Sequence, residues 1–418
     1  MKPTVHPHLF LLTGLLWLAG ACALGLLLFL GMTMGQGYGQ HLRPLHAHGA
    51  LLGGVMQIVG GLLLAGRDRA PSAPLVFAAL NLGTIGLLAG QTREDAILMS
   101  TSSLLFLSAI IALKDDLIRQ LRLSAVGGPL GWWYYSVALA SLAIGLLAGA
   151  AIPFRLLPPD SIGQGRLAHI HFLTQGFLLL MIVGAMHAQF PGGVNVNLHS
   201  TRVAQTTFAL LPSGIVILIV GFLLSDHWVQ IAGGLLMLAG AACYSYNTTR
   251  TWMSVGRAGR AGTDFSLIAT FFLVVASVCG IGVSANALGQ PPYVPLGSLH
   301  LMAYTHLAFV GFMLLSVLGA LINLLPRLLA DERAPSNKKR GPYEATLTAL
   351  AARGNLIQLC TISTGAMSLV VVAALVWQYP LSSPPVTYVA WAGALLLATG
   401  LALFVGNVVQ LLLVKPED

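Results

Sequence analysis

The sequence predicts an all-α membrane protein of twelve transmembrane helices, arranged as three pseudo-symmetric repeats of four helices. Three observations predict this class. The 418 residues are 56% hydrophobic and 8% charged, with a mean hydropathy of +0.82, which excludes a water-soluble globule. Twelve apolar segments approach or exceed the length of about 20 residues that a helix needs to cross the hydrocarbon core. One histidine motif recurs in the second, sixth and tenth of these segments.

The predicted helices follow one another closely and occupy nearly the whole chain. The first, at 9–32, has only Lys2 as a basic residue before it and is too long for a cleaved signal peptide, so we expect it to be retained. The others are expected at 47–66, 74–91, 96–113, 131–152, 168–189, 204–224, 228–246, 265–288, 300–325, 355–378 and 387–414. We therefore expect a single transmembrane domain over 1–418. Its repeats are expected at about 1–125, 126–260 and 261–418.

Lys and Arg residues are distributed unevenly between the two sides of the membrane. Of the 21 basic residues, seventeen fall on the side that holds the N-terminus. The other side has only Arg43, Arg93, Arg155 and Arg166. Because cytoplasmic loops carry the excess of Lys and Arg, we expect both termini in the cytoplasm and the chain in a bacterial inner membrane. The net charge of +8 reflects this topology, and we expect no nucleic-acid partner.

The connections between helices are short, with two polar exceptions on the cytoplasmic side. The stretch DERAPSNKKRGPYEATL at 331–347 is basic and is expected to be a surface loop, and TTRTWMSVGRAGRAGTD at 248–264 is expected to be a shorter one. On the outer side, the uncharged, proline-rich loops at 293–298 and 377–388 are expected to be capping turns or to cover a partner or a cofactor edge.

Each repeat carries a histidine near the outer end of its second helix, with a glycine five residues later. The copies are HGALLG from His48, HFLTQG from His171 and HLAFVG from His306. In the first two copies another histidine, His46 or His169, stands two residues earlier, and in the third Tyr304 takes that place. The outer ends of these helices lie at one membrane depth, so these side chains are expected to gather there.

Histidines inside a membrane require an explanation, because polar side chains are costly there and usually serve a function. Two neutral imidazoles from different helices can clamp the iron of a b-type heme, which makes heme the leading candidate. Copper is the second candidate because imidazole suits it, and a proton path is the third because histidine titrates near neutral pH. An interfacial histidine bound to a headgroup, water or carbonyl is the remaining alternative, and the threefold repetition argues against it.

The spacing within each His-x-His pair limits what the pair can bind. Residues of an α-helix advance by about 100 degrees each, so two residues that are two apart face nearly opposite sides. Such a pair serves two different sites, or one site if its first member precedes the helix. Arg43 and Arg166 lie just before the pairs, where a guanidinium can hold a heme propionate or a lipid phosphate. The glycines of the motif, which allow either a helix or a porphyrin to approach closely, are Gly53, Gly176 and Gly311.

These features together resemble the catalytic subunit of the heme-copper oxidase superfamily. The run HLRPLH at 41–46 is similar to the RLRPLH stretch of C-family oxidases and the related nitric oxide reductases. His306 with Gly311, and LLPRLL around Pro326, are similar to helix ten of those proteins. The resemblance implies an oxidase subunit I-like fold and a low-spin heme b held between His46 or His48 and His306. It also implies an electron donor, either a protein or quinol, and a diatomic gas as ligand.

Three departures from that family bear on the expected activity. Tyr304 stands where the oxidases have the histidine that binds the oxygen-reducing heme. The helix at 204–224 has no histidine for copper, and the motif of helix six has neither a tyrosine nor an acid for proton delivery. We therefore expect no complete oxygen-reducing heme-copper centre. His169 and His171 remain candidates for binding one copper ion or a second heme.

A second resemblance fits these departures. His46, Ala47 and His48, followed by Gly53, resemble the HAHExLFG motif of the NnrS family. The members of that family are twelve-helix membrane proteins associated with heme, copper and nitric oxide stress. Gly49 stands where that motif has its acid. We expect a membrane heme protein that handles electrons or a diatomic gas, nitric oxide or oxygen, near the outer face. Whether it is an oxidoreductase is left open. A terminal oxidase or nitric oxide reductase subunit, a copper or heme transporter, and a helical scaffold are the alternatives.

Overall fold

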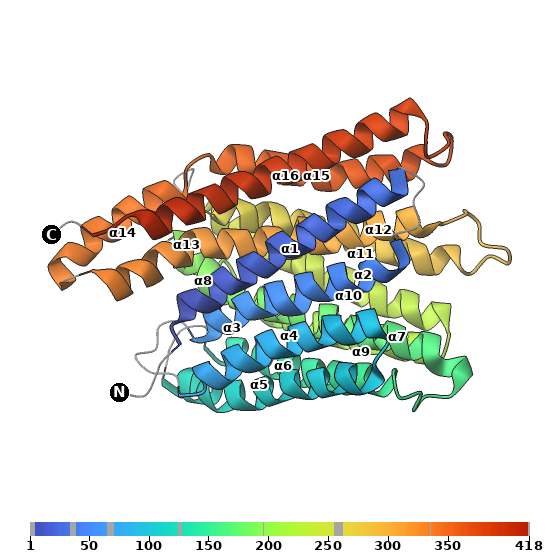
Figure 1. Ribbon diagram of the computed structural model, residues 1–418, viewed down its shortest axis with the longest axis horizontal. Helices are drawn as coiled ribbons and strands as arrows, with labels where there is room; N and C mark the ends of the chain where they lie inside the picture. The colour runs from blue at the N-terminus through green and yellow to red at the C-terminus, as the bar shows by residue number, and fades with distance from the viewer. Residues whose placement is uncertain are drawn as a thin grey trace. The chain divides into compact units, whose positions relative to one another are not determined.

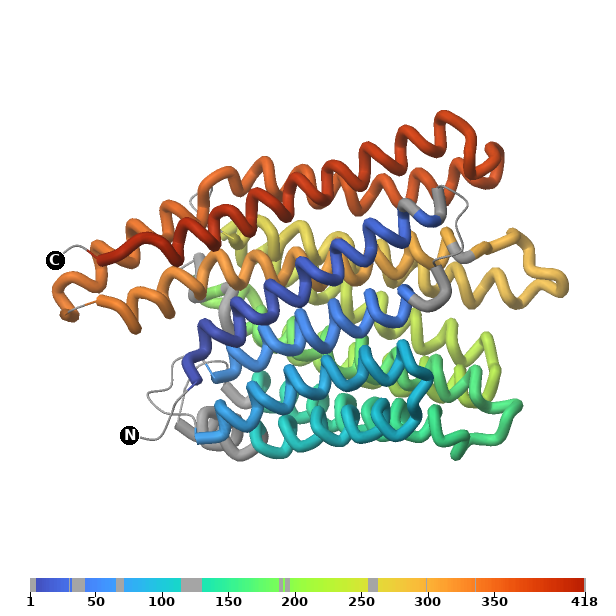
Figure 2. The backbone as a smooth tube through the Cα atoms, viewed as in Figure 1, coloured from blue at the N-terminus to red at the C-terminus, as the bar shows by residue number. Residues whose placement is uncertain are grey.

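The computed structural model describes residues 5–33, 39–64, 71–123, 128–194, 196–254, 262–334 and 336–416, and over these residues it contains helices and no strand (Figures 1 and 2). Within this part of the chain, twelve stretches are long and apolar enough to cross a membrane. They are Pro7–Phe29, Leu42–Leu64, Ala73–Arg93, Ala96–Leu113, Leu130–Ala151, Pro159–His187, Thr201–Leu223, His227–Met253, Thr263–Asn286, Leu299–Arg333, Asn337–Leu375 and Pro384–Leu413. The predicted all-α, twelve-span class is confirmed.

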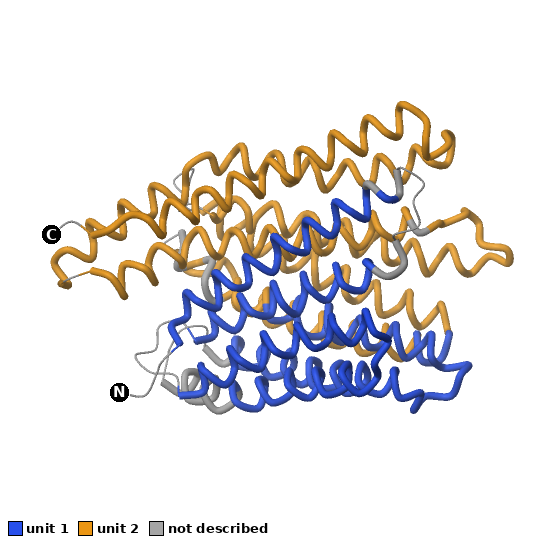
Figure 3. Tube along the Cα trace, viewed as in Figure 1, with its two compact units in different colours: residues 1–181, 222–225 blue, residues 182–221, 226–418 orange. Residues whose placement is uncertain are grey.

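The chain divides into two compact units (Figure 3). Unit 1 comprises Met1–Met181 with Phe222–Ser225, and unit 2 comprises Ile182–Gly221 with Asp226–Asp418. The boundary at Met181 falls inside the second of the three repeats expected from the sequence. The division into a single domain of three repeats stays a prediction, and each unit is described by itself below.

Unit 1 is built from helices that pack in the order in which they occur along the chain. Its helices are α1 (Pro7–Thr33), α2 (Gly39–His48), α3 (Met56–Leu64), α4 (Ala73–Arg93), α5 (Ala96–Leu123), α6 (Gly128–Ala151) and α7 (Ile162–His171). Two π-helical segments, η1 (Gly49–Val55) and η3 (Phe172–Leu179), and a short 3-10 turn, η2 (Pro159–Ser161), complete it. Helix α1 packs on α2, η1 and α3, while α6 packs on α5, α7 and η3. The first helix of each of these two repeats therefore lies against the histidine-bearing one.

Unit 2 shows the same kind of packing in its last repeat. Its helices are α8 (Leu180–Val194, from Ile182), α9 (Thr201–Leu223, to Gly221), α10 (His227–Met253), α11 (Thr263–Asn286), α12 (Ser298–His306), α13 (Leu315–Arg333), α14 (Asn337–Ala351), α15 (Asn355–Leu375) and α16 (Pro384–Leu413), with a π-helical segment η4 (Leu307–Leu314). Helix α11 packs on α12, η4 and α13, and α15 runs beside α16 (Figure 1).

Small residues allow helix backbones in unit 2 to approach closely, as is common in membranes. A side chain at Gly233 on α10 would lie 2.5 Å from the backbone nitrogen of Leu218 on α9. Two hydrogen bonds fix the connection before α9. The side-chain oxygen of the fully buried Asn247 on α10 accepts from the Ser200 backbone N–H at 3.0 Å, and its amide nitrogen donates to the Ser200 carbonyl at 3.0 Å. Glycine contacts and buried amides thus fix the neighbours of α10.

The expectation of a cytoplasmic loop at 331–347 is wrong, because most of that stretch is helical. Helix α13 continues to Arg333 and α14 begins at Asn337. Tyr343, Leu347 and Ala351 are buried at intervals of four residues, which is one face of a helix. The Tyr343 hydroxyl donates to the Val414 carbonyl at 2.8 Å. The polar composition of this stretch had obscured its helical spacing.

The second expected loop, at 248–264, is also partly helical. Helix α10 continues through Met253, and residues 255–261 lie outside the described part of the chain. The proline-rich loops of unit 2 at 293–298 and 377–388 pack on each other. The Trp377 indole N–H donates to the Pro295 carbonyl at 3.2 Å, and the Trp377 ring stacks on the His300 ring with centroids 4.7 Å apart. This contact favours the interpretation of these loops as capping turns.

Candidate functional site

Each repeat histidine lies at a junction between two kinds of helix. Helices α2, α7 and α12 end at His48, His171 and His306, and a π-helical segment begins at the very next residue in all three. π-Helical turns are rare and are frequently found at functional sites. Their hydrogen bonds join residues five apart, which equals the spacing between each histidine and its glycine. Each copy of the repeated motif therefore coincides with a π-helical segment.

The glycines of the motif serve helix packing. A side chain at Gly53 would lie 2.7 Å from the Trp17 ring of α1, and one at Gly176 would lie 2.6 Å from the Ser141 side chain of α6. Gly311 abuts Phe272 of α11 in the same way. Of the two roles open from the sequence, a close approach of helices is the one observed, because each glycine faces the first helix of its own repeat.

The second histidine of each motif is oriented by its own helix. The Nδ1 atom of His48 lies 2.9 Å from the Pro44 carbonyl, that of His171 lies 2.7 Å from the Leu167 carbonyl, and that of His306 lies 2.8 Å from the Met302 carbonyl. In each case the acceptor is four residues earlier. All three imidazoles are partly buried.

The first histidine of each pair instead faces the preceding helix. The Nδ1 atom of His46 lies 2.7 Å from the Ala21 carbonyl of α1, and that of His169 lies 2.7 Å from the Gly145 carbonyl of α6. The imidazoles fit against glycines, because a side chain at Gly25 would lie 2.9 Å from the His46 ring and one at Gly149 would lie 2.5 Å from the His169 ring.

The third repeat keeps this packing with a different residue. A side chain at Gly280 of α11 would lie 3.0 Å from the Tyr304 hydroxyl. Tyr304 thus occupies the place of a first histidine and lies against a glycine of the first helix of its repeat. Gly25, Gly149 and Gly280 are a further repeated feature of the sequence, whose role becomes visible only in the packed helices.

Both members of each His-x-His pair are helical. His46 and His48 lie within α2, and His169 and His171 lie within α7. One side chain of each pair contacts the preceding helix, and the other contacts its own helix. Of the alternatives open from the sequence, a pair that serves two different sides of its helix is therefore the one observed.

The five Nδ1 contacts define one tautomer. A carbonyl oxygen has no hydrogen to give, so a hydrogen bond to it makes Nδ1 the N–H donor. In the neutral imidazole the lone pair is then on Nε2. Metal-ligating histidines are held in the same way, with the second ring nitrogen donating to a carbonyl or a carboxylate. The arrangement leaves each of these rings in the form that can bind a metal through Nε2.

Two of the unit 1 histidines also have side-chain neighbours on other elements. The Gln91 side chain of α4, absent from the residues chosen from the sequence, reaches His48 with its amide nitrogen 2.9 Å from Nδ1. His171 packs on Phe222, with ring centroids 4.4 Å apart.

Gln91 and Pro44 approach the same ring nitrogen of His48. Protonated Nδ1 donates to the Pro44 carbonyl, whereas the Gln91 NH2 group would donate to unprotonated Nδ1.

The other candidate residues are placed as follows. Arg43 and Arg166 are exposed on α2 and α7, each three residues before the first histidine of its pair. Their guanidinium groups can therefore reach headgroups or an anionic group at the end of the helix. His306 and Tyr304 belong to unit 2, whereas the other four histidines of the motif belong to unit 1.

Other histidines of unit 2 differ from this set. His300 Nδ1 accepts from the Gly297 backbone N–H at 3.0 Å, so its proton is on Nε2 in the neutral form. His187 packs edge-on against the buried Tyr244, with ring centroids 5.3 Å apart. The thiols of Cys22, Cys243, Cys279 and Cys360 are free.

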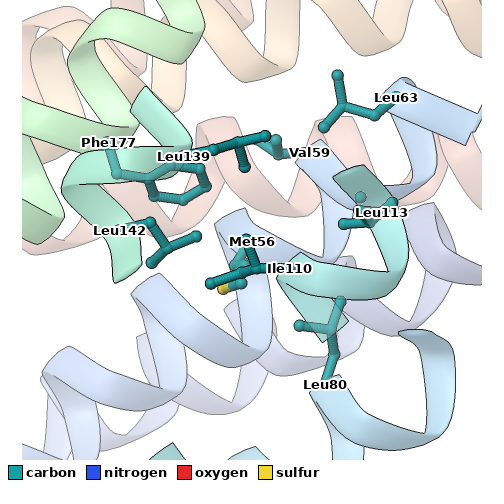
Figure 4. Close-up of a pocket in the computed structure, with 10 residues that line it drawn as sticks. Met56, Val59, Leu63, Leu80, Ile110, Leu113, Leu139, Leu142 and Phe177 are labelled. Carbon is teal, nitrogen blue, oxygen red and sulfur yellow. The ribbon is translucent and has the colours of Figure 1, made fainter. Parts of the chain in front are cut away.

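Unit 1 also contains a small apolar pocket next to the π segments (Figure 4). Met56 comes directly after η1, and Phe177 lies within η3. The remaining lining residues are Val59, Gly60, Leu63, Leu80, Ile110, Leu113, Leu139 and Leu142. They come from α3, α4, α5 and α6, so these helices and η3 surround one common space. Its lining offers water no hydrogen-bond partner.

Comparison with known proteins gives no assignment, since no protein-family model and no curated protein matches the chain. The function therefore has to be argued from the site itself.

Proposed function

We propose that this chain is a multi-pass membrane protein that binds b-type heme through histidine side chains and handles electrons or a diatomic gas. One observation carries the proposal. Five imidazoles at the two matching positions of a repeated motif all have Nδ1 on a backbone carbonyl. An interfacial histidine that binds only headgroups or water gives no reason for the same tautomer to recur in two different packing environments. Iron ligation by Nε2 does give such a reason.

The donor chemistry of the chain fits a heme. His46 or His48, together with His306, are the ligands that the resemblance to heme-copper oxidases implies, and Arg43 and Arg166 would pair with the propionates. When bound, the heme would supply a redox-active iron that can take up nitric oxide or oxygen. The residues of the chain hold the imidazoles in one tautomer and surround them with apolar helices. Tyr304 supports a site without a complete heme-copper oxygen-reducing centre.

The proposal includes a location and partners. The Lys and Arg distribution supports a bacterial inner membrane with both termini in the cytoplasm and the histidines near the outer face. Electrons would come from a donor protein or quinol. These points rest on the sequence and on the resemblance.

The test is a reduced-minus-oxidised visible spectrum of the purified protein, with the heme quantified as its pyridine hemochrome. We expect at least one b-type heme per chain and a spectral shift on addition of nitric oxide or carbon monoxide. A protein that takes up no heme when it is expressed with an ample heme supply would overturn the proposal. Heme without a gas-induced shift would restrict the function to electron transfer.

A further inference from the structure

The loops that join α11 to α12 and α15 to α16 carry no charged residue. They lie within the stretches 265–326 and 354–414, which contain no Asp, Glu, Lys or Arg. Three other connections expected on the outer side do carry acids, with Asp95 after α4, Asp160 between α6 and α7, and Asp226 before α10. Charged side chains keep a connection in water, because burying them elsewhere is costly. The two uncharged loops therefore differ from connections of the same chain that face water.

The two loops form one surface at the same end of unit 2 (Figure 1). The Trp377 indole N–H donates to the Pro295 carbonyl at 3.2 Å, and the Trp377 ring stacks on the His300 ring with centroids 4.7 Å apart. We call residues 287–297 and 376–383 together the outer cap. His300 belongs to the first turn of α12, the helix that ends at His306. The outer cap therefore covers the beginning of a histidine-bearing helix.

The exposed side chains of the outer cap are aromatic and aliphatic. Tyr293 is 75% exposed and Trp377 is 52% exposed, and Tyr379 and Leu381 are exposed as well. Tyr388, in the second turn of α16, is 73% exposed. Tyr and Trp combine an apolar ring with a polar tip, so they are enriched where the bilayer meets water. This set of side chains fits a phospholipid headgroup layer.

The backbone of the first loop is hydrogen-bonded within the loop. Asn286 holds it from both sides, since its Oδ1 accepts from the Val294 N–H at 2.7 Å and its Nδ2 donates to the Val294 carbonyl at 2.8 Å. The Tyr293 N–H donates to the Asn286 carbonyl at 3.4 Å, and the Gly297 N–H donates to His300 Nδ1 at 3.0 Å. The residues of this loop that have no N–H are Pro291, Pro292 and Pro295.

The second loop is closed in the same way. The N–H groups of Gln378 and Tyr379 donate to the Leu375 carbonyl at 3.0 and 2.9 Å, and the Ser383 N–H donates to the Pro380 carbonyl at 2.9 Å. Backbone groups that are already paired lose little when they leave water, whereas unpaired ones are costly in a bilayer. These internal bonds therefore allow both loops to lie among lipids.

We propose that the outer cap lies in the headgroup layer of the outer leaflet and that its partner is the phospholipid surface. The cap joins membrane-spanning stretches that end at Asn286 and Leu375 to stretches that begin at Leu299 and Pro384, so lipid is close to it on the membrane side. A partner protein that binds through charge finds no complementary charge in either loop. The proposal is independent of heme binding.

The test measures the depth of the outer cap in a bilayer. The full-length protein, with alanine at its four cysteines, receives one new cysteine at a time and a nitroxide label. It is reconstituted into liposomes of phosphatidylethanolamine and phosphatidylglycerol. Electron paramagnetic resonance then gives the collision rates of the label with oxygen, which concentrates in the bilayer, and with a nickel chelate, which stays in water. The labelled sites are Tyr293→Cys and Tyr379→Cys.

Two matched positions provide the references. Asp160→Cys lies in a charged outer connection and reports on water, and Leu395→Cys, at a side chain 62% exposed on α16, reports on the bilayer. We expect the ratio of oxygen to nickel collisions at 293 and 379 to lie between the ratios at 160 and 395. Thermal unfolding of each labelled protein establishes that it remains folded.

Two results would overturn the proposal. A ratio at 293 or 379 equal to that at 160 would place that loop of the outer cap in water. Low collision rates with both reagents would show that another copy of the chain or another protein covers the cap in place of lipid.

Discussion

His306 allows the ligand role and the packing role of a histidine to be separated. Its Nδ1 donates to the Met302 carbonyl at 2.8 Å, and Nε2 is the proposed iron ligand. His306→Asn keeps a donor at the place of Nδ1, whereas His306→Gln puts an amide near the place of Nε2 and removes the Nδ1 donor. A hydrogen bond of this kind contributes about 1 kcal/mol, or about fivefold in the unfolding equilibrium. We therefore expect His306→Gln to be destabilised by that amount and His306→Asn to remain near wild type.

Both variants should lose heme despite their different stabilities. Losing an iron ligand should weaken heme binding by more than the ~100-fold seen for residues that only orient a ligand. The assay combines pyridine hemochrome quantitation with thermal unfolding in detergent, followed by tryptophan fluorescence. Retention of full heme by the well-folded His306→Asn protein would refute the assignment of His306 and the reasoning from its tautomer.

Three further predictions test the surroundings of the site. His187→Asn should keep the full heme content in the same hemochrome assay, and loss of heme from a folded variant would contradict the proposed ligand set. Gly53→Ala should lower the unfolding temperature, because overpacking costs about 1–3 kcal/mol. Gly20→Ala is the control and should leave the unfolding temperature unchanged, because nothing lies within 4 Å of a side chain built at Gly20. Equal effects of the two substitutions would contradict the packing role of Gly53. Asn247→Leu should cost about 2–4 kcal/mol, because it leaves both backbone groups of Ser200 without their partner, and an unchanged denaturation midpoint would show that these bonds contribute little.

The sequence by itself determined the class and the number of membrane-spanning helices. Apolar length decides whether a segment can cross the hydrocarbon, and this property is local to the segment. The motif from His48 to Gly53 and its two copies were visible for the same reason, since a fixed spacing needs no knowledge of neighbours. The π segments that begin directly after each motif histidine were not predicted from the sequence. The helix α14 was missed because polar residues on one face concealed the buried spacing of Tyr343 and Leu347.

Only the tertiary structure decided which atoms each histidine presents. The acceptors of His46 and His169 are Ala21 and Gly145, both 24 or 25 residues away along the chain and adjacent only after two helices have packed. Gln91 reaches His48 from another helix, 43 residues away. A tautomer depends on the geometry of a single hydrogen bond, which sequence spacing does not contain. For this reason the repeated histidines could be singled out from the sequence, whereas their hydrogen-bond partners came from the packing of the helices.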